Sequence, residues 1–259
     1  MKVAIMQPYF LPYIGYFQLI GAVDVFIVYD NIKYTKRGWI NRNRMLQNGK
    51  DVMFSLPLKS DSDLLNVCDR ELAADFKRTK MLNQISDAYR RAPYFAHIYP
   101  LIEKIVTYEE HNLFKFLQNS IATTCKHLGL TTKICISSSI AIDHNLKSQD
   151  KVLALCEATG ASTYVNAIGG IDLYSRDEFK TRGIELKFSR PMLFEYTQFG
   201  NVFVPWLSII DVMMFNSIEV ILKIIKNSSE LVNDEHPQEN FLARAIRPGN
   251  IIDISRKNQ

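Results

Sequence analysis

The sequence predicts an α/β fold with a mostly parallel sheet in a Rossmann-like layered arrangement and an inserted helical subdomain. Short runs of β-branched and aromatic residues alternate with amphipathic stretches, as in sheets that are covered on both faces. Residues 1–30 read as a strand, a crossover helix and a second strand, a unit that joins parallel strands. Between residues 76 and 129 the hydrophobic period becomes helical in three consecutive segments, which predicts the subdomain.

The elements follow from the same patterns. The predicted strands are 3–6, 25–29, 52–58, 133–137, 163–166 and 184–188. The predicted helices are 17–23, 76–89, 93–107, 112–128, 150–159 and 207–215. We expect one α/β domain over residues 1–226, with its helical insertion at about 76–129, and a polar tail or arm over residues 227–259.

Composition restricts the class of protein. The chain has 259 residues, of which 47% are hydrophobic, and a formal net charge of +4. This mild charge is spread along the chain, unlike the dense basic surface of a nucleic-acid-binding protein. No apolar run approaches the roughly 20 residues of a membrane span, and no signal-peptide pattern is found. We therefore expect a cytoplasmic protein without membrane insertion.

The four cysteines are widely spaced and form no C-x-x-C pair. Because no Cys/His cluster has the spacing of metal ligands, a zinc site is not expected. The cysteines read instead as reduced and mostly buried thiols, which suits a cytosolic protein.

The first cluster of candidate functional residues runs from Gln7 to Phe17, where the first strand ends and a helix begins. Parallel α/β folds bind ligands at that edge. Gly15 lets the backbone approach a ligand or the helix start. The rings predicted to hold a base or a sugar are Tyr9, Tyr13 and Tyr16. Alternatively, these rings only fill the space between helix and sheet, but Gln7 favours a function because a packing loop needs no amide there.

The second cluster follows the second strand. Asp30 stands at its carboxyl edge, where a carboxylate can bind a sugar hydroxyl or accept a proton from an amine. Arg42 and Arg44 flank Asn43 and match the geometry of phosphate oxygens, and Trp39 offers a stacking surface. The alternative is a solvated basic loop.

Two further clusters are weaker. Asn166 ends a strand shortly before the turn Gly169-Gly170. This pattern is typical of a strand end that binds a ligand, and equally of a tight turn without a binding role. Gln198 precedes Ser208 and Asp211, whose spacing predicts a capping-box-like helix start. Among the histidines, His144 follows a strand end and is the one candidate base. P-loop, G-x-G-x-x-G and nucleophile-elbow motifs are absent from the sequence.

Together these clusters resemble the WbqC-like family. The matching landmarks are Gln7-Pro8-Tyr9-Phe10-Leu11-Pro12, Gly15-Tyr16-Phe17, Asp30, Trp39 with Asn41-Arg42-Asn43, Ala92-Pro93-Tyr94-Phe95, Ser138-Ser139, Gly160-Ala161 with Tyr164, and Leu207-Ser208-Ile209-Ile210-Asp211. They occur in the family's order, from residue 1 to about residue 220. Where the family often has Tyr-x-Ser-Gly, this chain has Tyr164-Val165-Asn166-Ala167, a change that bears on which substrate is accepted.

The resemblance implies a role in the assembly of O-antigen or a related surface polysaccharide, by transfer of glycine or another acyl group to an amino sugar. A looser similarity joins the first strand, the Pro12-x-x-Gly15 helix start and the second strand to the HIGH-motif nucleotidylyltransferases. The histidines of that motif are absent here. This second similarity implies ATP-dependent activation as an alternative.

We therefore expect a transferase that adds glycine or another acyl or aminoacyl group to the amine of a nucleotide-linked amino sugar. Such a reaction needs a base, donors for an oxyanion and cations for the diphosphate. The expected base or sugar anchor is Asp30, the donors are Gln7 and Asn166, and the phosphate clamps are Arg42 and Arg44.

Two other functions stay open, an ATP-dependent nucleotidylyltransferase-like enzyme and a non-catalytic binding protein of a glycan assembly complex. The sequence also leaves open the acyl donor, which is free glycine with ATP, an aminoacyl-tRNA, a carrier-protein thioester or coenzyme A. The sugar, any cofactor and the oligomeric state are open as well.

Overall fold

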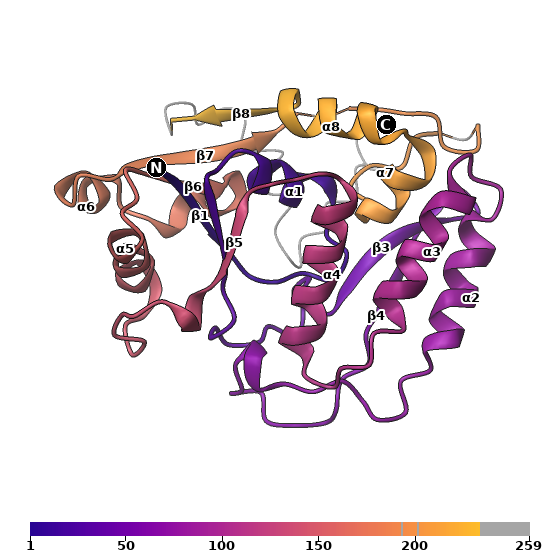
Figure 1. Ribbon diagram of the computed structural model, residues 1–259, viewed down its shortest axis with the longest axis horizontal. Helices are drawn as coiled ribbons and strands as arrows, with labels where there is room; N and C mark the ends of the chain where they lie inside the picture. Colours follow the sequence, from indigo (N-terminus) through magenta and orange to yellow (C-terminus); the bar gives the residue numbers. More distant parts are fainter. Residues whose placement is uncertain (193, 201, 234–259) are drawn as a thin grey trace, which may run out of the picture.

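A six-stranded sheet forms the centre of the computed structural model, which describes residues 1–192, 194–200 and 202–233 (Figure 1). The strand order is β5-β2-β1-β6-β7-β8. The strands are β1 (Lys2–Met6), β2 (Val25–Val28), β5 (Lys133–Ile136), β6 (Thr163–Ala167), β7 (Glu185–Pro191) and β8 (Ser229–Val232). The first five are parallel and β8 is antiparallel to β7. The predicted α/β fold with a mostly parallel sheet is confirmed.

Helices cover both faces of this sheet, which is why the central strands are apolar throughout rather than alternating. One face carries α5 (Ser148–Ala158) and α6 (Arg176–Thr181), whose apolar side chains pack with Val3 and Ile5 of β1. The opposite face carries α1 (Ile14–Gly21), α7 (Ile209–Phe215) and α8 (Ile218–Asn227), which pack with Ala4 of β1. Because α1 is buried on nearly every side, it has no polar face.

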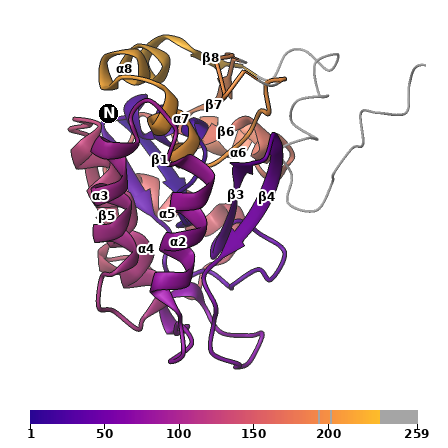
Figure 2. The same cartoon turned by 90° about the vertical axis from the view of Figure 1, so that its right-hand side faces the viewer.

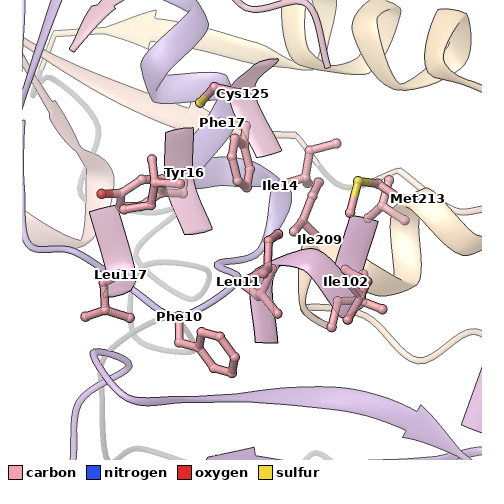
Figure 3. Packing of buried hydrophobic residues seen from close by; sticks show 14 of the residues in the cluster. Phe10, Leu11, Ile14, Tyr16, Phe17, Ile102, Leu117, Cys125, Ile209 and Met213 are labelled. Carbon is pink, nitrogen blue, oxygen red and sulfur yellow. The ribbon is translucent and has the colours of Figure 1, made fainter. Parts of the chain in front are cut away.

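Three consecutive helices follow between β4 and β5, as the helical period predicts. They are α2 (Arg78–Tyr89), α3 (Phe95–Val106) and α4 (Leu113–His127). Their apolar side chains belong to the same core as those of α1 and α7. Figure 3 shows Ile102 of α3 and Leu117 of α4 in the same cluster as Phe10, Leu11 and Phe17.

A two-stranded hairpin, β3 (Arg42–Gln47) with β4 (Lys50–Ser55), lies outside the main sheet (Figure 2). The prediction of residues 52–58 as a strand of the covered sheet is therefore wrong in its location and its end. The turn Asn48-Gly49 has positive φ at both residues, 52° and 74°, the conformation of tight antiparallel hairpins. An Asn-Gly dipeptide is a sequence signal for a local hairpin, which the strand prediction for residues 52–58 does not include.

Four further elements were not predicted. No strand is predicted over residues 42–47, which form β3, and α6 and α8 have no predicted counterpart. Residues 229–232 were assigned to the irregular tail, yet they form β8, which pairs with β7 from Phe188–Val232 to Pro191–Ser229. Residues 234–259 of that predicted tail lie outside the described residues. The 3₁₀ turns are η1 (Val67–Asp69), η2 (Ser137–Ser139) and η3 (Ile168–Leu173).

Candidate functional site

The direction in which the chain adds strands reverses between β1 and β6. From β1 the chain adds β2 and β5 on one side, then crosses to add β6 and β7 on the other. In the described chain β1 pairs with β2 at four positions but with β6 at two, Lys2–Thr163 and Val3–Tyr164. Open α/β sheets bind ligands at the carboxyl ends of strands where the order reverses. We therefore take the strand ends around β1 as the candidate site.

Six polar residues stand at or beside these strand ends, and we call them the strand-end site. They are Gln7, Tyr29, Asp30, Ser137, Lys151 and Asn166. Gln7 and Tyr29 follow the neighbouring strands β1 and β2, and Tyr29 N–H donates to Met6 O at 2.8 Å. Sequence reasoning had selected Gln7, Asp30 and Asn166, and it missed Tyr29 and Lys151.

Asp30 is buried, with 3% of its surface exposed. Its Oδ1 accepts hydrogen bonds from Ser137 Oγ at 2.6 Å and from Ser138 N–H at 2.9 Å. In the described part of the chain, Oδ2 accepts no hydrogen bond and no cation lies within ion-pair distance. The carboxylate is thus fixed through one oxygen, and its other oxygen stays available to a ligand.

His144 forms hydrogen bonds through both ring nitrogens. Nδ1 lies 2.9 Å from Asn31 Nδ2, which can only donate, so Nδ1 accepts. Nε2 lies 3.0 Å from the carbonyl of Ile140 and therefore carries the proton. This is the neutral tautomer with both nitrogens occupied. The predicted base His144 would have to break the bond with Asn31 to accept a proton, so we assign it to holding the loop before α5.

Lys151 lies in the first turns of α5, with 4% of its surface exposed. Its Nζ donates to His144 O at 3.2 Å and to Asn31 O at 3.4 Å, and it stands 5.3 Å from the centre of the Tyr29 ring. Burial lowers the pKa of Lys151, while the Asp30 carboxylate opposes that shift. Burial also raises the pKa of Tyr29 to about 12, helped by Tyr174 and Asp30.

Asn166 is 5% exposed, and none of the described residues forms a hydrogen bond with its side-chain amide. Its Nδ2 rests against Gly170, where an added Cβ would lie 2.3 Å away. At Gly169 an added Cβ would meet nothing within 4 Å. Gly170 therefore makes room for Asn166, whose unpaired side-chain amide stays accessible to water or a ligand.

The loop between β1 and α1 serves packing more than the sequence predicts. Phe10, Leu11 and Phe17 are fully buried. The ring of Tyr13 occupies the space beside Gly15, because an added Cβ there would lie 2.2 Å from the ring. This glycine therefore admits the protein's own tyrosine rather than a ligand, contrary to the role predicted for it.

Tyr9 and Tyr13 of this loop, which are half-buried, lie with the buried Tyr16 of α1 in one aromatic group. Tyr9 and Tyr16 lie with ring centroids 5.7 Å apart, and Tyr16 hydroxyl donates to Gln7 O at 3.1 Å. Burial raises the pKa of Tyr9 to about 12, and it raises those of Tyr13 and Tyr16 further, with Tyr9 adding to both shifts. These phenols are therefore neutral hydrogen-bonding groups rather than bases near neutral pH.

An aromatic cleft opens between α1 and the segment after β7. The enclosed part of the cleft has a volume of about 30 Å³, and the wider depression around it, about 400 Å³, is open to solvent. Tyr13, Tyr196, Phe203 and Trp206 line it, and none of the described residues that line it is charged. The ring centroids of Tyr13 and Trp206 lie 6.0 Å apart. Such walls offer an uncharged aromatic contact surface at the open side of the cleft.

The basic hairpin presents one arginine more freely than the other. Arg44 forms an ion pair with Asp51 at 3.2 Å, donates to Trp206 O at 3.3 Å and stacks over the half-buried Trp39. Arg42 uses Nε to bind Gly38 O at 2.9 Å, and its terminal nitrogens have no hydrogen bond to the described chain. Of the two arginines predicted to bind phosphate, Arg42 is the one whose terminal guanidinium nitrogens are available to a ligand.

Asn43 and Gln198 were predicted to bind substrate, but their amides are used inside the protein. Asn43 Nδ2 donates to Leu11 O at 2.9 Å and to Phe10 O at 3.2 Å, so it holds the loop in which Leu11 has a φ of 43°. Gln198 Nε2 donates to Asp211 Oδ2 at 2.6 Å. In this structure both amides are therefore occupied by backbone and carboxylate partners, and a role in binding substrate would require them to exchange these partners.

The predicted capping-box-like pair at α7 is half present. Ser208 caps the helix, because its Oγ accepts from Ile210 N–H at 3.3 Å. Asp211 does not reach back to Ser208, whose N–H donates to Arg44 O at 2.8 Å. Its carboxylate instead accepts hydrogen bonds from Tyr89 and Tyr196, in addition to Gln198.

The arrangement supports some chemistries better than others. Within the described residues, no three His, Cys, Asp or Glu side chains come together as metal ligands, and no helix is long and apolar enough to cross a membrane. The described cysteines are free thiols. What the strand ends offer is a fixed carboxylate, two amides and an amine.

The comparison with family models decides the relationship. A model described as the WbqC-like protein family matches residues 7–222. The chain belongs to the WbqC-like family. A relative of this WbqC-like protein is an uncharacterized protein of Mycobacterium tuberculosis, 27% identical over 219 residues, which cover 83% of this chain and 93% of the relative. The match of the family model includes each residue of the strand-end site.

Proposed function

We propose that this WbqC-like protein is a transferase that adds glycine or another acyl group to the amine of a nucleotide-linked amino sugar used in surface-polysaccharide assembly. The observation that carries the proposal is the Asp30 carboxylate. It is buried at the strand ends around β1, with Oδ1 held by Ser137 and Ser138 and with Oδ2 available. A carboxylate in this state can hold an ammonium group and accept a proton from it.

The remaining groups fit the other needs of acyl transfer. When the amine attacks the acyl carbonyl, its nitrogen forms the new bond, the carbonyl oxygen becomes an oxyanion and the acyl group's former carrier leaves. The amides of Gln7 and Asn166 supply N–H donors for that oxyanion, and the Asn166 amide has no partner among the described residues. Asp30 receives the proton that the amine loses.

The nucleotide part of the substrate has two candidate contacts. Arg42 offers terminal nitrogens for a diphosphate oxygen, whereas Arg44 is already paired with Asp51. The aromatic side chains at the open side of the cleft, Tyr13 and Trp206 among them, offer uncharged surfaces on which a base can stack. These contacts support a nucleotide-linked substrate over a free sugar.

The direct test is mass spectrometry of reactions that contain a nucleotide-linked amino sugar and one donor at a time. The donors are glycine with ATP, an aminoacyl-tRNA, an acyl carrier thioester and an acyl coenzyme A. We expect one combination to give the mass of the acylated sugar, and Asp30→Asn to abolish it without unfolding the protein. Asp24→Asn is the matched control, because Asp24 is exposed at the opposite end of β2.

Other outcomes would assign the protein differently. Consumption of ATP with release of pyrophosphate in the absence of any sugar would replace acyl transfer by nucleotidylyl transfer. Binding of the nucleotide-linked sugar without turnover of any donor would replace it by a binding role in a glycan assembly complex. Full activity of Asp30→Asn would remove the carboxylate from the reaction.

A further inference from the structure

The aromatic cleft owes one of its walls to the segment after β7, residues 194–200 and 202–206, which we call the aromatic loop. Tyr196, Phe203 and Trp206 of this loop line the cleft. All three rings are half-buried, so each presents part of its surface to solvent. The described residues of the loop form no helix or strand, so side-chain contacts must give the loop its shape.

Gln198 closes the aromatic loop on itself. Its Oε1 accepts the N–H of Val204 at 2.8 Å, and its Nε2 donates to Val204 O at 3.2 Å. One side chain thus satisfies both backbone groups of Val204, as a neighbouring strand would. These bonds also fix the orientation of the amide, because only its nitrogen can donate and only its oxygen can accept. Gln198 is 1% exposed, so the bonds are shielded from water.

Two other elements hold the closed loop in place. Asp211 of the helix α7 accepts hydrogen bonds at Oδ2 from Gln198 Nε2 and from the Tyr196 hydroxyl, both at 2.6 Å. Its side chain is fully buried. Near the other end of the loop, Arg44 of β3 donates to Trp206 O at 3.3 Å. The aromatic loop is therefore attached to α7 on one side and to the hairpin on the other.

Two bulky residues of the loop have a left-handed backbone. Phe199 has a φ of 40° and Trp206 has a φ of 61°. For residues with a large side chain this conformation is unfavourable, and it persists only where the surrounding contacts hold it. Phe199 directly follows Gln198, and its ring packs edge-to-face on Phe215 of α7 with centroids 4.8 Å apart. The loop is therefore held in one conformation by its contacts.

The surroundings of the cleft indicate the ligand that these rings fit. The enclosed part of about 30 Å³ is too small for a ring, so a ligand must stack on the open side. None of the described lining residues is charged, which favours an uncharged planar group. A place for an anion lies beside it, since Arg44 reaches Trp206 O and Arg42 is two positions away on the same face of β3. A nucleobase that carries a diphosphate combines both features.

We propose that Gln198 and Asp211 are positioning residues that hold the rings of the aromatic loop as a preformed stacking surface for the base of the nucleotide-linked substrate. The inference rests on the proposed function, which requires a nucleotide-linked sugar, and it adds the place where the base is bound. A surface that is already ordered loses less conformational entropy on binding and therefore binds more tightly. Gln198 and Asp211 act through the loop that they hold.

The first measurement needs no ligand. The sequence has two tryptophans, so Trp39→Phe leaves the fluorescence of Trp206 alone. In that background, Gln198→Met removes the amide and keeps the length of the side chain. We expect it to increase acrylamide quenching of Trp206 by about twofold or more, because the loop opens locally without its closing bonds. A change that only lowers global stability leaves quenching in the native protein unaltered.

Two more variants make this measurement decisive. Asp211→Asn keeps an oxygen that can accept from Gln198, so it should leave the quenching of Trp206 near that of the parent. Gln198→Asn is too short to reach Val204 and Asp211 together, and it serves if the methionine variant fails to fold. The matched control is Gln84→Met, which makes the same change on α2, outside the lining of the cleft, and should have no effect.

The second measurement identifies the ligand. Adenosine, cytidine, guanosine, uridine and thymidine diphosphates are titrated by isothermal calorimetry into proteins that keep Trp39. We expect at least one of them to bind the wild type, and to bind Gln198→Met about tenfold more weakly because the loop must then be ordered on binding. Gln84→Met should bind it as the wild type does.

The outcomes separate this inference from the proposed reaction. Unchanged acrylamide quenching in a folded Gln198 variant overturns the role of Gln198 in holding the loop. If no nucleoside diphosphate binds the wild type, or if Gln198→Met binds it equally well, the role in positioning a base is overturned. Neither measurement depends on acyl transfer. Failure to detect an acylated sugar would therefore remove the proposed reaction while the base-binding surface remained supported by its own data.

Discussion

Tyr89 and Asp211, 122 positions apart in the chain, share a buried hydrogen bond of 2.9 Å between the phenol hydroxyl and Oδ1. The same hydroxyl accepts the backbone N–H of Leu46 at 2.9 Å. Helix α2, the hairpin strand β3 and helix α7 are thus joined at one oxygen atom. Tyr196 and Gln198 bind the other carboxylate oxygen, which ties the segment after β7 to the same point.

Removing this hydroxyl should destabilise the fold. Tyr89→Phe deletes the donor to Asp211 and leaves the buried Leu46 N–H without an acceptor, so we expect the free energy of unfolding to fall by about 1–3 kcal/mol. Urea denaturation followed by circular dichroism measures the change. The control is Tyr108→Phe, whose ring is 39% exposed. Equal stabilities of Tyr89→Phe and the wild type would show that the hydrogen bonds contribute nothing.

Asp211 should make stability depend on pH in a defined direction. Burial raises its pKa above the ordinary value of 3.8, although three hydrogen bonds oppose the shift. The folded state therefore favours the protonated carboxyl. The contribution of Asp211 to the free energy of unfolding is complete below about pH 3.8, its ordinary pKa, and is lost as the pH rises through the raised pKa of the folded state. Relative to Asp211→Asn, the wild type should lose stability across that window. Urea titrations at several pH values give the difference, and a gain with rising pH would contradict the prediction.

Gly169 and Gly170 should respond differently to the same change. A Cβ at Gly170 would lie 2.3 Å from Asn166 Nδ2 and displace that amide, whereas a Cβ at Gly169 meets nothing within 4 Å. We expect Gly170→Ala to weaken binding of the nucleotide-linked sugar at least tenfold and Gly169→Ala to leave it unchanged. Isothermal titration calorimetry of both variants makes the comparison, with thermal melts to confirm that both fold. Similar affinities would exclude the Asn166 amide from the binding site.

The buried cysteines should be inert in the folded protein. Burial raises the thiol pKa values of Cys125 and Cys156 to about 12, and the thiolate is the reactive form. Alkylation followed by peptide mass spectrometry should find both unmodified in native protein and both modified in urea. The half-buried Cys135 gives an internal comparison in the same sample. Rapid native labelling of Cys125 would indicate that α4 opens locally.

Sequence patterns predicted the elements whose environment is simple. Strands such as β1 and β2 are buried on both faces, so they appear as uninterrupted apolar runs. Strand β3 escaped prediction because it begins Arg42-Asn43-Arg44, and its buried residue at position 43 is an amide that binds the neighbouring loop. Strand β8 is polar and short, and its pairing with β7 comes from tertiary context alone.

The site shows a similar division. Strand ends were predictable, and so were Asp30 and Asn166 as polar residues placed there. The sequence could not predict which amides stay available to a ligand. Asn43 and Gln198 have the same side-chain chemistry as Asn166, but they bind the protein's own backbone or Asp211. Lys151 was missed because a lysine on a helix usually faces water. Its one local signal is its place beside Val152 and one turn before Leu155, on the buried side of α5.

The strand order has a consequence for synthesis of the protein. Lys2 and Val3 of the central strand β1 pair with Thr163 and Tyr164, so that edge of β1 stays open until most of the chain has left the ribosome. An apolar strand with an open edge invites pairing with other chains. We therefore expect early cover of β1 by the local β1-α1-β2 unit to protect the nascent protein until β6 has been synthesised. Substitutions that weaken α1 should lower the yield of soluble protein more than the stability of molecules that have already folded.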